Sequence, residues 1–219
     1  MRFTRDEIRQ SMLLYAVTDR TWLGEHTLAQ EVETVLKNGA TFLQIREKEL
    51  CRDSFLAEAR ALKALAEEYH VPFVVNDDIG IALEIGADGV HVGQSDIVGK
   101  DVRAMIGPDK ILGISANTVE TALAAERAGA DYIGVGAVFG TTTKKDAKCL
   151  SVPQFRAICD AVTIPVVAIG GISAGNILEL KGSGVDGVAV VSAIFAQKDV
   201  GEATRKLLAL SREMVASHG

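Results

Sequence analysis

The chain has 219 residues, of which 48% are hydrophobic and 24% charged, and its formal net charge is −6. This acidic balance, with no basic block, argues against nucleic acid as a partner. No run of about 20 apolar residues exists, so no membrane span is expected.

The N-terminal segment MRFTRDEIRQ lacks the apolar stretch of a secretory signal. The three cysteines form no CxxC pair, so neither structural disulfides nor a zinc site is expected. A reducing, cytoplasmic location is the resulting expectation.

The predicted elements alternate along the chain. The segment TRDEIRQSM indicates a short extra helix before the first strand. Eight short segments rich in valine and isoleucine follow, as is typical of strands buried on both faces. They lie near residues 13–18, 41–47, 72–76, 88–92, 110–114, 131–136, 164–169 and 186–191.

Helical patterns lie between these strands. One of them begins near the N-capping candidate Ser54, and another opens on Thr118. Because strand and helix alternate strictly, the sequence predicts a parallel sheet.

A repeat favours closure of that sheet. Gly39, Gly86, Gly129 and Gly184 open four similar segments and are separated by 47, 43 and 55 residues. Each interval holds two strand–helix units of about 25 to 30 residues. An eight-unit barrel typically needs roughly 200 to 250 residues. We therefore expect residues 1–219 to form a single (β/α)8 TIM-barrel domain rather than a doubly wound open sheet.

Polar side chains gather where the predicted strands end, which is where barrel enzymes carry their chemistry. Gln44, Arg46 and Lys48 are spaced by two and share one face of an extended strand, whereas Phe42 and Ile45 are expected to point the other way. Burying three polar groups without a role would cost several kcal/mol. The alternative is that the strand has already ended and leaves the trio in solvent.

Asp77 and Asp96 follow neighbouring strands. Two carboxylates facing one cavity repel each other, and an all-oxygen ligand set suits Mg²⁺. The alternatives are that either residue caps a helix or acts as a base. Asp78 is expected to be solvated or to cap a helix.

Two other segments suggest anion binding. The loop GTTTKKDAK at residues 140–148 offers hydroxyls, backbone N–H groups and lysines that can close on phosphate oxygens, although such loops are usually just solvated. Gly170 and Gly171, with Val191 and Ser192, stand where these barrels often bind phosphate. An ordinary strand-to-helix turn is the alternative.

His91 lies inside a predicted strand. A buried, hydrogen-bonded histidine is the preferred interpretation, ahead of a catalytic one.

Several strings occur here in one order, each at a strand end, and together they resemble the thiamine phosphate synthase family from about residue 13 to residue 195. They are LYAVTD, FLQIREK, VVNDD, GADGVHVGQSD, GIS, GADYIGVGAVFGTTTKKDA, AIGGI and GVAVVSAI. The resemblance implies a transferase of thiamine biosynthesis that acts on two small-molecule substrates. An aminopyrimidine methyl diphosphate would lose pyrophosphate with the help of Mg²⁺, and the nitrogen of a thiazole phosphate, carboxylated or not, would attack the methylene.

The resemblance also implies roles for particular residues. The diphosphate would be held by Gln44, Arg46, Lys48, Asn76 and Lys144. The Mg²⁺ would be held by Asp77 and Asp96. Ser115 would face the pyrimidine and the diphosphate, and Thr141 and Thr143 the thiazole phosphate side. That phosphate would bind Gly171, Val191 and Ser192. The catalytic residues would be Arg46, Lys48, Ser115 and Lys144.

Three rival functions remain open. A related thiazole tautomerase relies on a histidine where this chain has Asn117, and it lacks the full set of metal-binding residues. A phosphosugar isomerase would need a base at a strand end, for which Glu47 is the only weak candidate. A non-catalytic protein that senses a thiamine precursor is the third. The sequence leaves the oligomeric state open.

Overall fold

Eight parallel strands close into a barrel in the order of the sequence. The structure is a computed structural model that describes residues 3–140 and 149–216. The strands are β1 (Leu14–Val17), β2 (Phe42–Ile45), β3 (Phe73–Asn76), β4 (Gly89–Val92), β5 (Ile111–Ala116), β6 (Tyr132–Val135), β7 (Val166–Ile169) and β8 (Gly187–Val190). β1 pairs with β8 as well as with β2, which leaves no free edge. The predicted (β/α)8 barrel is therefore confirmed.

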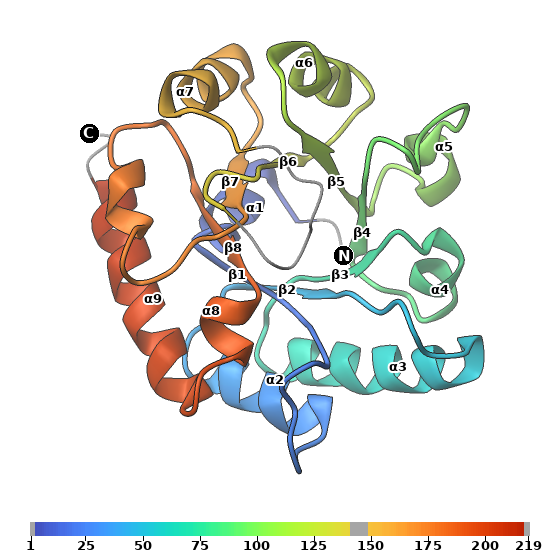
Figure 1. The fold of residues 1–219 in the computed structure, drawn as a ribbon. Helices are drawn as coiled ribbons and strands as arrows, with labels where there is room; N and C mark the ends of the chain where they lie inside the picture. Colours follow the sequence, from blue (N-terminus) through green and yellow to red (C-terminus); the bar gives the residue numbers. More distant parts are fainter. Residues whose placement is uncertain (1–2, 141–148, 217–219) are drawn as a thin grey trace.

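Helices surround the barrel as an outer ring (Figure 1). They are α2 (Leu28–Lys37), α3 (Arg52–Glu68), α4 (Ile79–Glu84), α5 (Val102–Ile106), α6 (Val119–Arg127), α7 (Val152–Ala161), α8 (Ser192–Phe195) and α9 (Val200–Val215), with a 3-10 turn η1 (Ile177–Leu180). Thr118 caps α6 as predicted, because its side chain accepts the N–H of Thr121. The prediction for α3 was wrong: that helix is capped at Cys51, and Ser54 lies within its first turn.

The extra helix α1 (Arg5–Ser11) is confirmed and closes one end of the barrel. A reciprocal capping box between Thr4 and Glu7 starts it. Arg9 pairs with Asp186 and donates to the carbonyl of Thr163 at 2.9 Å. Since these two residues come just before β8 and β7, α1 covers the amino-terminal ends of the strands and leaves the carboxyl ends open.

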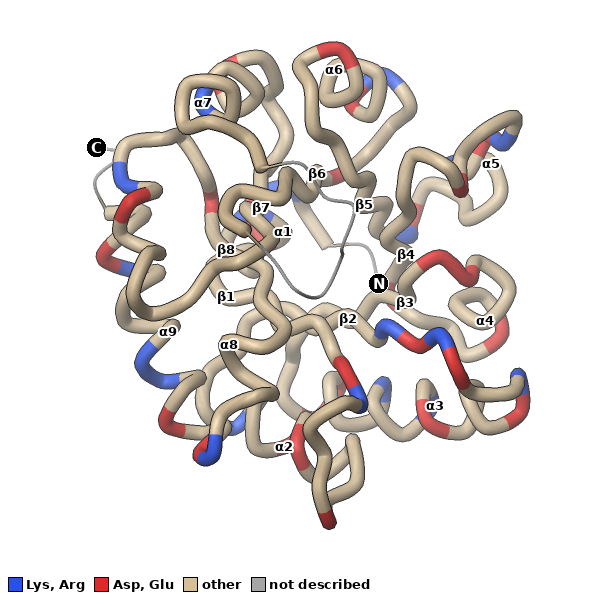
Figure 2. The backbone as a smooth tube through the Cα atoms, viewed as in Figure 1, with Lys and Arg blue, Asp and Glu red and all other residues tan. Residues whose placement is uncertain are grey.

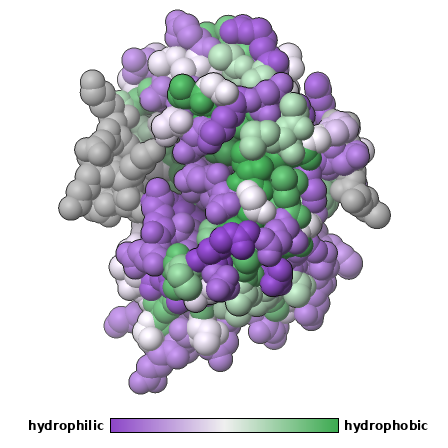
Figure 3. Space-filling model, turned by 90° about the vertical axis from the view of Figure 1, so that its right-hand side faces the viewer, coloured by the Kyte–Doolittle hydropathy of each residue, from purple (hydrophilic) through white to green (hydrophobic). Residues whose placement is uncertain are grey.

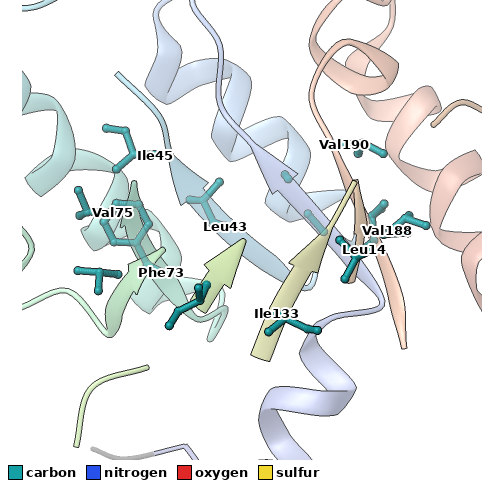
Figure 4. Close-up of a cluster of buried hydrophobic side chains, with 14 of the residues drawn as sticks. Leu14, Leu43, Ile45, Phe73, Val75, Ile133, Val188 and Val190 are labelled. Atoms are coloured by element: carbon teal, nitrogen blue, oxygen red, sulfur yellow. The ribbon is translucent and has the colours of Figure 1, made fainter. Parts of the chain in front are cut away.

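Apolar side chains form two separate clusters, one on each face of the barrel wall. The larger cluster fills the space between strands and helices, and Figure 4 shows Leu43, Phe73, Ile133 and Val188 among its members. Because alternate residues of a strand point to opposite faces, one strand can contribute to both clusters, as β2 does with Leu43 in the larger cluster and Phe42 in the smaller one.

The smaller cluster fills the barrel interior and contains three aromatic rings. Phe42 packs against Tyr15 with ring centroids 4.4 Å apart and against Tyr132 at 5.6 Å. The expectation that Phe42 faces the helices was therefore wrong. It lies two residues from Gln44, so the period of an extended strand places both side chains inside the barrel.

The flank of the molecule that carries α4 and α5 shows a band of apolar surface among hydrophilic residues (Figure 3). Leu83 of α4, Met105 of α5 and Val98 of the loop from β4 to α5 are large exposed apolar side chains. Within the described residues, no helix combines the length and the apolar character needed to cross a bilayer.

Replacement of Leu43 tests how much the larger cluster contributes to stability. Leu43 is fully buried, so Leu43→Ala should lower the free energy of unfolding by about 2 to 5 kcal/mol, through lost burial and the cavity left behind. Urea denaturation measures this loss. Leu83→Ala is the matched control, because Leu83 is 46% exposed, and it should change stability by less than about 0.5 kcal/mol. Equal losses in the two variants would contradict the placement of Leu43.

Candidate active site

The carboxyl ends of all the strands meet at one rim of the barrel, and charged residues gather at one part of it. Figure 2 shows the alternating cations and acids that follow β2, beside the acids that lead from β3 into α4. β2 and β3 are adjacent in the sheet, with Ile45 paired to Val75. The structure thus brings together the polar segments that the sequence singled out after these two strands.

Arg46 and Lys48 follow β2 at this rim. The N–H of Arg46 donates to the hydroxyl of Thr18 at 3.0 Å, which ties the end of β2 to the residue after β1. Its guanidinium is half-buried and lies 3.9 Å from the Asp19 carboxylate. Lys48 is exposed. The segment after β2 therefore carries two cations: Arg46, which lies near the Asp19 carboxylate, and Lys48, which faces solvent.

Glu47, between these two cations, organises the loop that carries them. Its Oε1 accepts the N–H groups of Lys48 and Glu49, both at 2.7 Å, and of Leu50 at 3.2 Å. Its side chain is only 3% exposed, and its Oε2 lies 3.7 Å from Arg20 Nε. One oxygen of Glu47 thus binds the backbone, and the other is buried and turned toward Arg20. Because the carboxylate is shielded from solvent and faces away from the mouth, the isomerase interpretation loses its candidate.

Asp77 and Asp96 lie close enough for their carboxylates to interact. Asp96 comes from the turn after β4, where its Oδ2 accepts the N–H of Gly93 at 2.9 Å. Asn76 donates to Asp77 Oδ2 at 2.6 Å. Asp78 is not part of the pair, because its Oδ1 accepts the N–H of Ile81 and caps α4. The structure therefore separates the two candidate metal ligands from the capping residue.

The backbone of Asp77 adopts the left-handed region, with φ of +63°. This conformation is uncommon outside glycine and is tolerated best by Asn and Asp. The N–H of Asp77 donates to the carbonyl of His91 on the neighbouring strand at 2.9 Å, which holds the turn in place. Sparsely populated backbone conformations of this kind are often found at functional sites.

Partial burial raises the pKa of the Asp77 carboxyl, the negative charge of Asp96 raises it further, and Lys48 acts in the opposite direction. A divalent cation between the two carboxylates would relieve this repulsion. Within the described residues, no group of three or more His, Cys, Asp or Glu side chains could hold a metal ion. Two carboxylates are nevertheless enough for Mg²⁺, which keeps waters and binds substrate phosphates as its other ligands. The residues present thus fit a shared Mg²⁺ site.

Ser115 and Gln44 lie inside the mouth and are joined by hydrogen bonds through three other side chains. Ser115 Oγ lies 3.0 Å from His91 Nε2, and His91 Nδ1 lies 2.9 Å from the hydroxyl of Tyr132. The hydroxyls of Tyr132 and Tyr15 are 2.8 Å apart, and Gln44 Nε2 donates to Tyr15. His91 is half-buried and hydrogen-bonded, in agreement with its preferred interpretation.

The candidate phosphate site lies at the ends of β7 and β8, which are neighbours in the sheet. Gly170 and Gly171 both have positive φ, and a Cβ on Gly171 would lie 2.3 Å from the carbonyl oxygen of Gly140. Only glycine therefore fits the close approach of these two turns. Val191 precedes α8, and Ser192 is its first residue.

The structure brings most of the predicted site residues to this one rim. Thr141, Thr143 and Lys144 lie outside the described residues. Tyr15, Tyr132 and the structural role of Glu47 were not predicted from the sequence. For the tyrosines, the available signal was a phenol on the inward face of a strand, because a buried hydroxyl needs a partner.

The fold and these side chains define a TIM-barrel enzyme with its site at the carboxyl ends of the strands. The family model described as thiamine monophosphate synthase matches residues 14–194. A thiamine-phosphate synthase of Ruminiclostridium cellulolyticum is 50% identical over 89% of this chain and 93% of its own length. One from Clostridium tetani is 44% identical over 91% and 96%.

A solved structure indicates the same family. The thiamine phosphate pyrophosphorylase of Pyrococcus furiosus is 38% identical, covers 95% of this chain and 99% of its own, and superposes with a TM-score of 0.86. The chain belongs to the thiamine monophosphate synthase family and is a transferase. The resemblance inferred from the sequence is thereby confirmed, ahead of the tautomerase, isomerase and sensor alternatives.

Neutralising Asp77 should stabilise the folded protein at neutral pH. A raised pKa in the folded state means that stability is lost as the pH rises through that pKa, so the Asp77 charge destabilises the folded protein at pH 7. Asp77→Asn tolerates the left-handed backbone and should be more stable than the parent at pH 7. This advantage should vanish below the ordinary Asp pKa of about 3.9.

Urea unfolding at a series of pH values measures this difference, and Mg²⁺ should stabilise the parent more than the variant. Asp109→Asn, at an exposed turn before β5, is the control. A variant less stable than the parent at pH 7 would contradict the repulsion between Asp77 and Asp96.

Removal of the Glu47 carboxylate should loosen the loop after β2. Glu47→Ala leaves three N–H groups without their acceptor and should lower the free energy of unfolding by about 1 to 3 kcal/mol. Hydrogen exchange of the amides of residues 48–50 should become faster. Glu49→Ala changes an exposed neighbour and should leave exchange and stability unchanged. Unaltered exchange in Glu47→Ala would show that other contacts hold the loop.

Proposed function

We propose that this protein condenses 4-amino-2-methyl-5-(diphosphooxymethyl)pyrimidine with a thiazole phosphate, carboxylated or not, to give thiamine phosphate and pyrophosphate. The observation that carries the proposal is the meeting of Lys48 with the paired carboxylates of Asp77 and Asp96 at the barrel mouth. The names of the relatives supply the reaction class.

The first step breaks the bond between the pyrimidine methylene carbon and the diphosphate oxygen. The bonding electrons leave with the diphosphate, which gathers negative charge as the methylene becomes cationic. Arg46 and Lys48 stabilise this departing charge more in the transition state than in the ground state. In our proposal, Gln44 and Asn76 hold the diphosphate beside these cations, and Ser115 faces both it and the pyrimidine.

Asp77 and Asp96 would hold Mg²⁺. When bound there, the ion would neutralise charge on the diphosphate oxygens. The local cations and the metal thus explain how a chain with a net charge of −6 can take a polyanionic substrate.

The second step forms the carbon–nitrogen bond. The thiazole nitrogen donates its electron pair to the methylene. A carboxylated thiazole also releases CO2, whose bonding electrons stay on the ring carbon and take up a proton from solvent. We place the thiazole phosphate at Gly171, Val191 and Ser192, where two adjacent strand ends and the first N–H groups of a short helix suit an anion. The residues Thr141, Thr143 and Lys144 complete the proposal by resemblance alone.

The test is turnover by the purified full chain with both substrates and Mg²⁺, with pyrophosphate and thiamine phosphate both measured. Asp96→Asn keeps an oxygen to accept the Gly93 N–H but removes the charge. It should lower kcat/KM by about a hundredfold or more, since a metal supplies several kcal/mol and each 1.36 kcal/mol is tenfold.

Asp109→Asn is again the matched control and should leave turnover unchanged. The Asp96→Asn variant should retain the cooperative unfolding of the parent, so that a loss of rate is not a loss of fold. Near-normal activity of Asp96→Asn would overturn the metal assignment, and absence of both products with the parent protein would overturn the proposed reaction.

A further inference from the structure

A continuous chain of hydrogen bonds crosses the inside of the barrel. Its members come from five different strands, β2, β1, β6, β4 and β5, in the order Gln44, Tyr15, Tyr132, His91 and Ser115. It therefore joins two residues of the proposed substrate site, Gln44 and Ser115, through three residues to which the proposed function assigns no role.

The barrel wall leaves space for this chain. A Cβ on Gly113 would lie 2.3 Å from the Tyr132 hydroxyl and 2.6 Å from His91 Nδ1. A Cβ on Gly134 would lie 3.1 Å from His91 Cε1. Two glycines on the neighbouring strands β5 and β6 thus make room for the imidazole and the phenol to meet inside the barrel.

The donors and acceptors give the chain a direction. The Gln44 amide nitrogen has only protons to offer, so Tyr15 accepts from it. Within the described residues, the remaining hydrogen-bond contact of the Tyr15 hydroxyl is Tyr132, to which it therefore donates. Tyr132 in turn donates to His91 Nδ1, and the neutral imidazole then carries its proton on Nε2.

The final link sets the state of Ser115. In the direction set by the Gln44 amide, His91 Nε2–H would donate to Ser115 Oγ, which lies 3.0 Å away, and the serine would keep its own proton for another group. Ser115 lies near the carboxyl end of β5, and its carbonyl accepts from Gln94, in the turn that carries Asp96, at 2.6 Å. The opposite direction would require the Gln44 amide to be rotated. Ser115 would then donate its proton to His91 Nε2 and could only accept a hydrogen bond from the substrate.

We propose that Tyr15, Tyr132 and His91 are positioning residues that hold the Ser115 hydroxyl as a hydrogen-bond donor to an anionic oxygen of the substrate. This rests on the proposed function, in which a diphosphate leaves beside Ser115. A donor held in advance at an oxygen that gains charge stabilises the transition state without reorganisation at the moment of reaction.

The chemistry of the two phenols agrees with this role. Burial raises the pKa of both Tyr15 and Tyr132 far above the usual value, so both keep their protons at any working pH. Because the hydroxyls stay neutral, each one fixes which way its neighbour donates, from Gln44 to Ser115, and the chain adds no charge to the site.

The first experiment determines the direction of the hydrogen-bond chain and needs no substrate. Long-range ¹H–¹⁵N NMR of protein labelled at histidine distinguishes the two neutral tautomers, and His91→Asn identifies the signal. The proposal requires the proton on Nε2 in the parent protein. A proton on Nδ1 would overturn it, whether or not the enzyme turns over.

The second experiment asks whether the chain acts through Ser115. Ser115→Ala should lower kcat by about a hundredfold, the effect of losing one donor to a developing oxyanion, with KM changed far less. Tyr132→Phe keeps the ring but removes one hydrogen bond of the chain, and should lower kcat by about tenfold. Tyr69→Phe, near the end of α3, is the matched control and should behave like the parent.

The double variant decides the result. If Tyr132 acts by positioning Ser115, Tyr132→Phe should have little further effect in the Ser115→Ala background. Multiplicative losses would overturn the positioning role, and so would full activity of Ser115→Ala. Absence of turnover in the parent would instead overturn the proposed reaction, while the tautomer would still report on the chain.

Discussion

β1 pairs with β8, and this pairing closes the sheet into a barrel. A parallel strand exposes backbone groups on both edges, and in a closed barrel each edge finds a neighbour. All eight strands then run the same way, so every carboxyl end reaches the same rim. Residues from strands far apart in sequence become neighbours there, while α1 closes the opposite end with Ile8 and Met12.

The barrel interior is built differently from the layer outside it. Outside, only apolar side chains are needed to hold helices against strands, and the cluster around Leu43 and Phe73 shows this. Inside the barrel, the rings of Tyr15, Phe42 and Tyr132 pack against one another. The two phenol oxygens belong to the hydrogen-bond chain that reaches the mouth. A buried hydroxyl without a partner would be costly, so the chain satisfies these groups while it links two strand ends.

Electrostatics at the mouth depends on local arrangement rather than on net charge. Asp77 and Asp96 repel each other, which favours binding of a cation, while Lys48 and Arg46 offer positive charge to an anion beside them. Glu47 stays out of this balance because it accepts backbone N–H groups and faces Arg20. In the proposed reaction, this arrangement would let an acidic protein bind a metal and a polyphosphate together.

The eight strands, their order and the rim on which the polar residues lie could all be predicted from the amino-acid sequence. Short runs of valine and isoleucine mark strands buried on both faces, and chain order equals barrel order. The sequence also predicted that Asp77 and Asp96 would be neighbours, because they follow consecutive strands. The contacts between inward side chains, in contrast, became visible only in the folded barrel. Tyr15 and Tyr132 are separated by 117 residues and meet across the barrel from strands that are not adjacent. No local period encodes such a contact, because it depends on the curvature that closes the sheet.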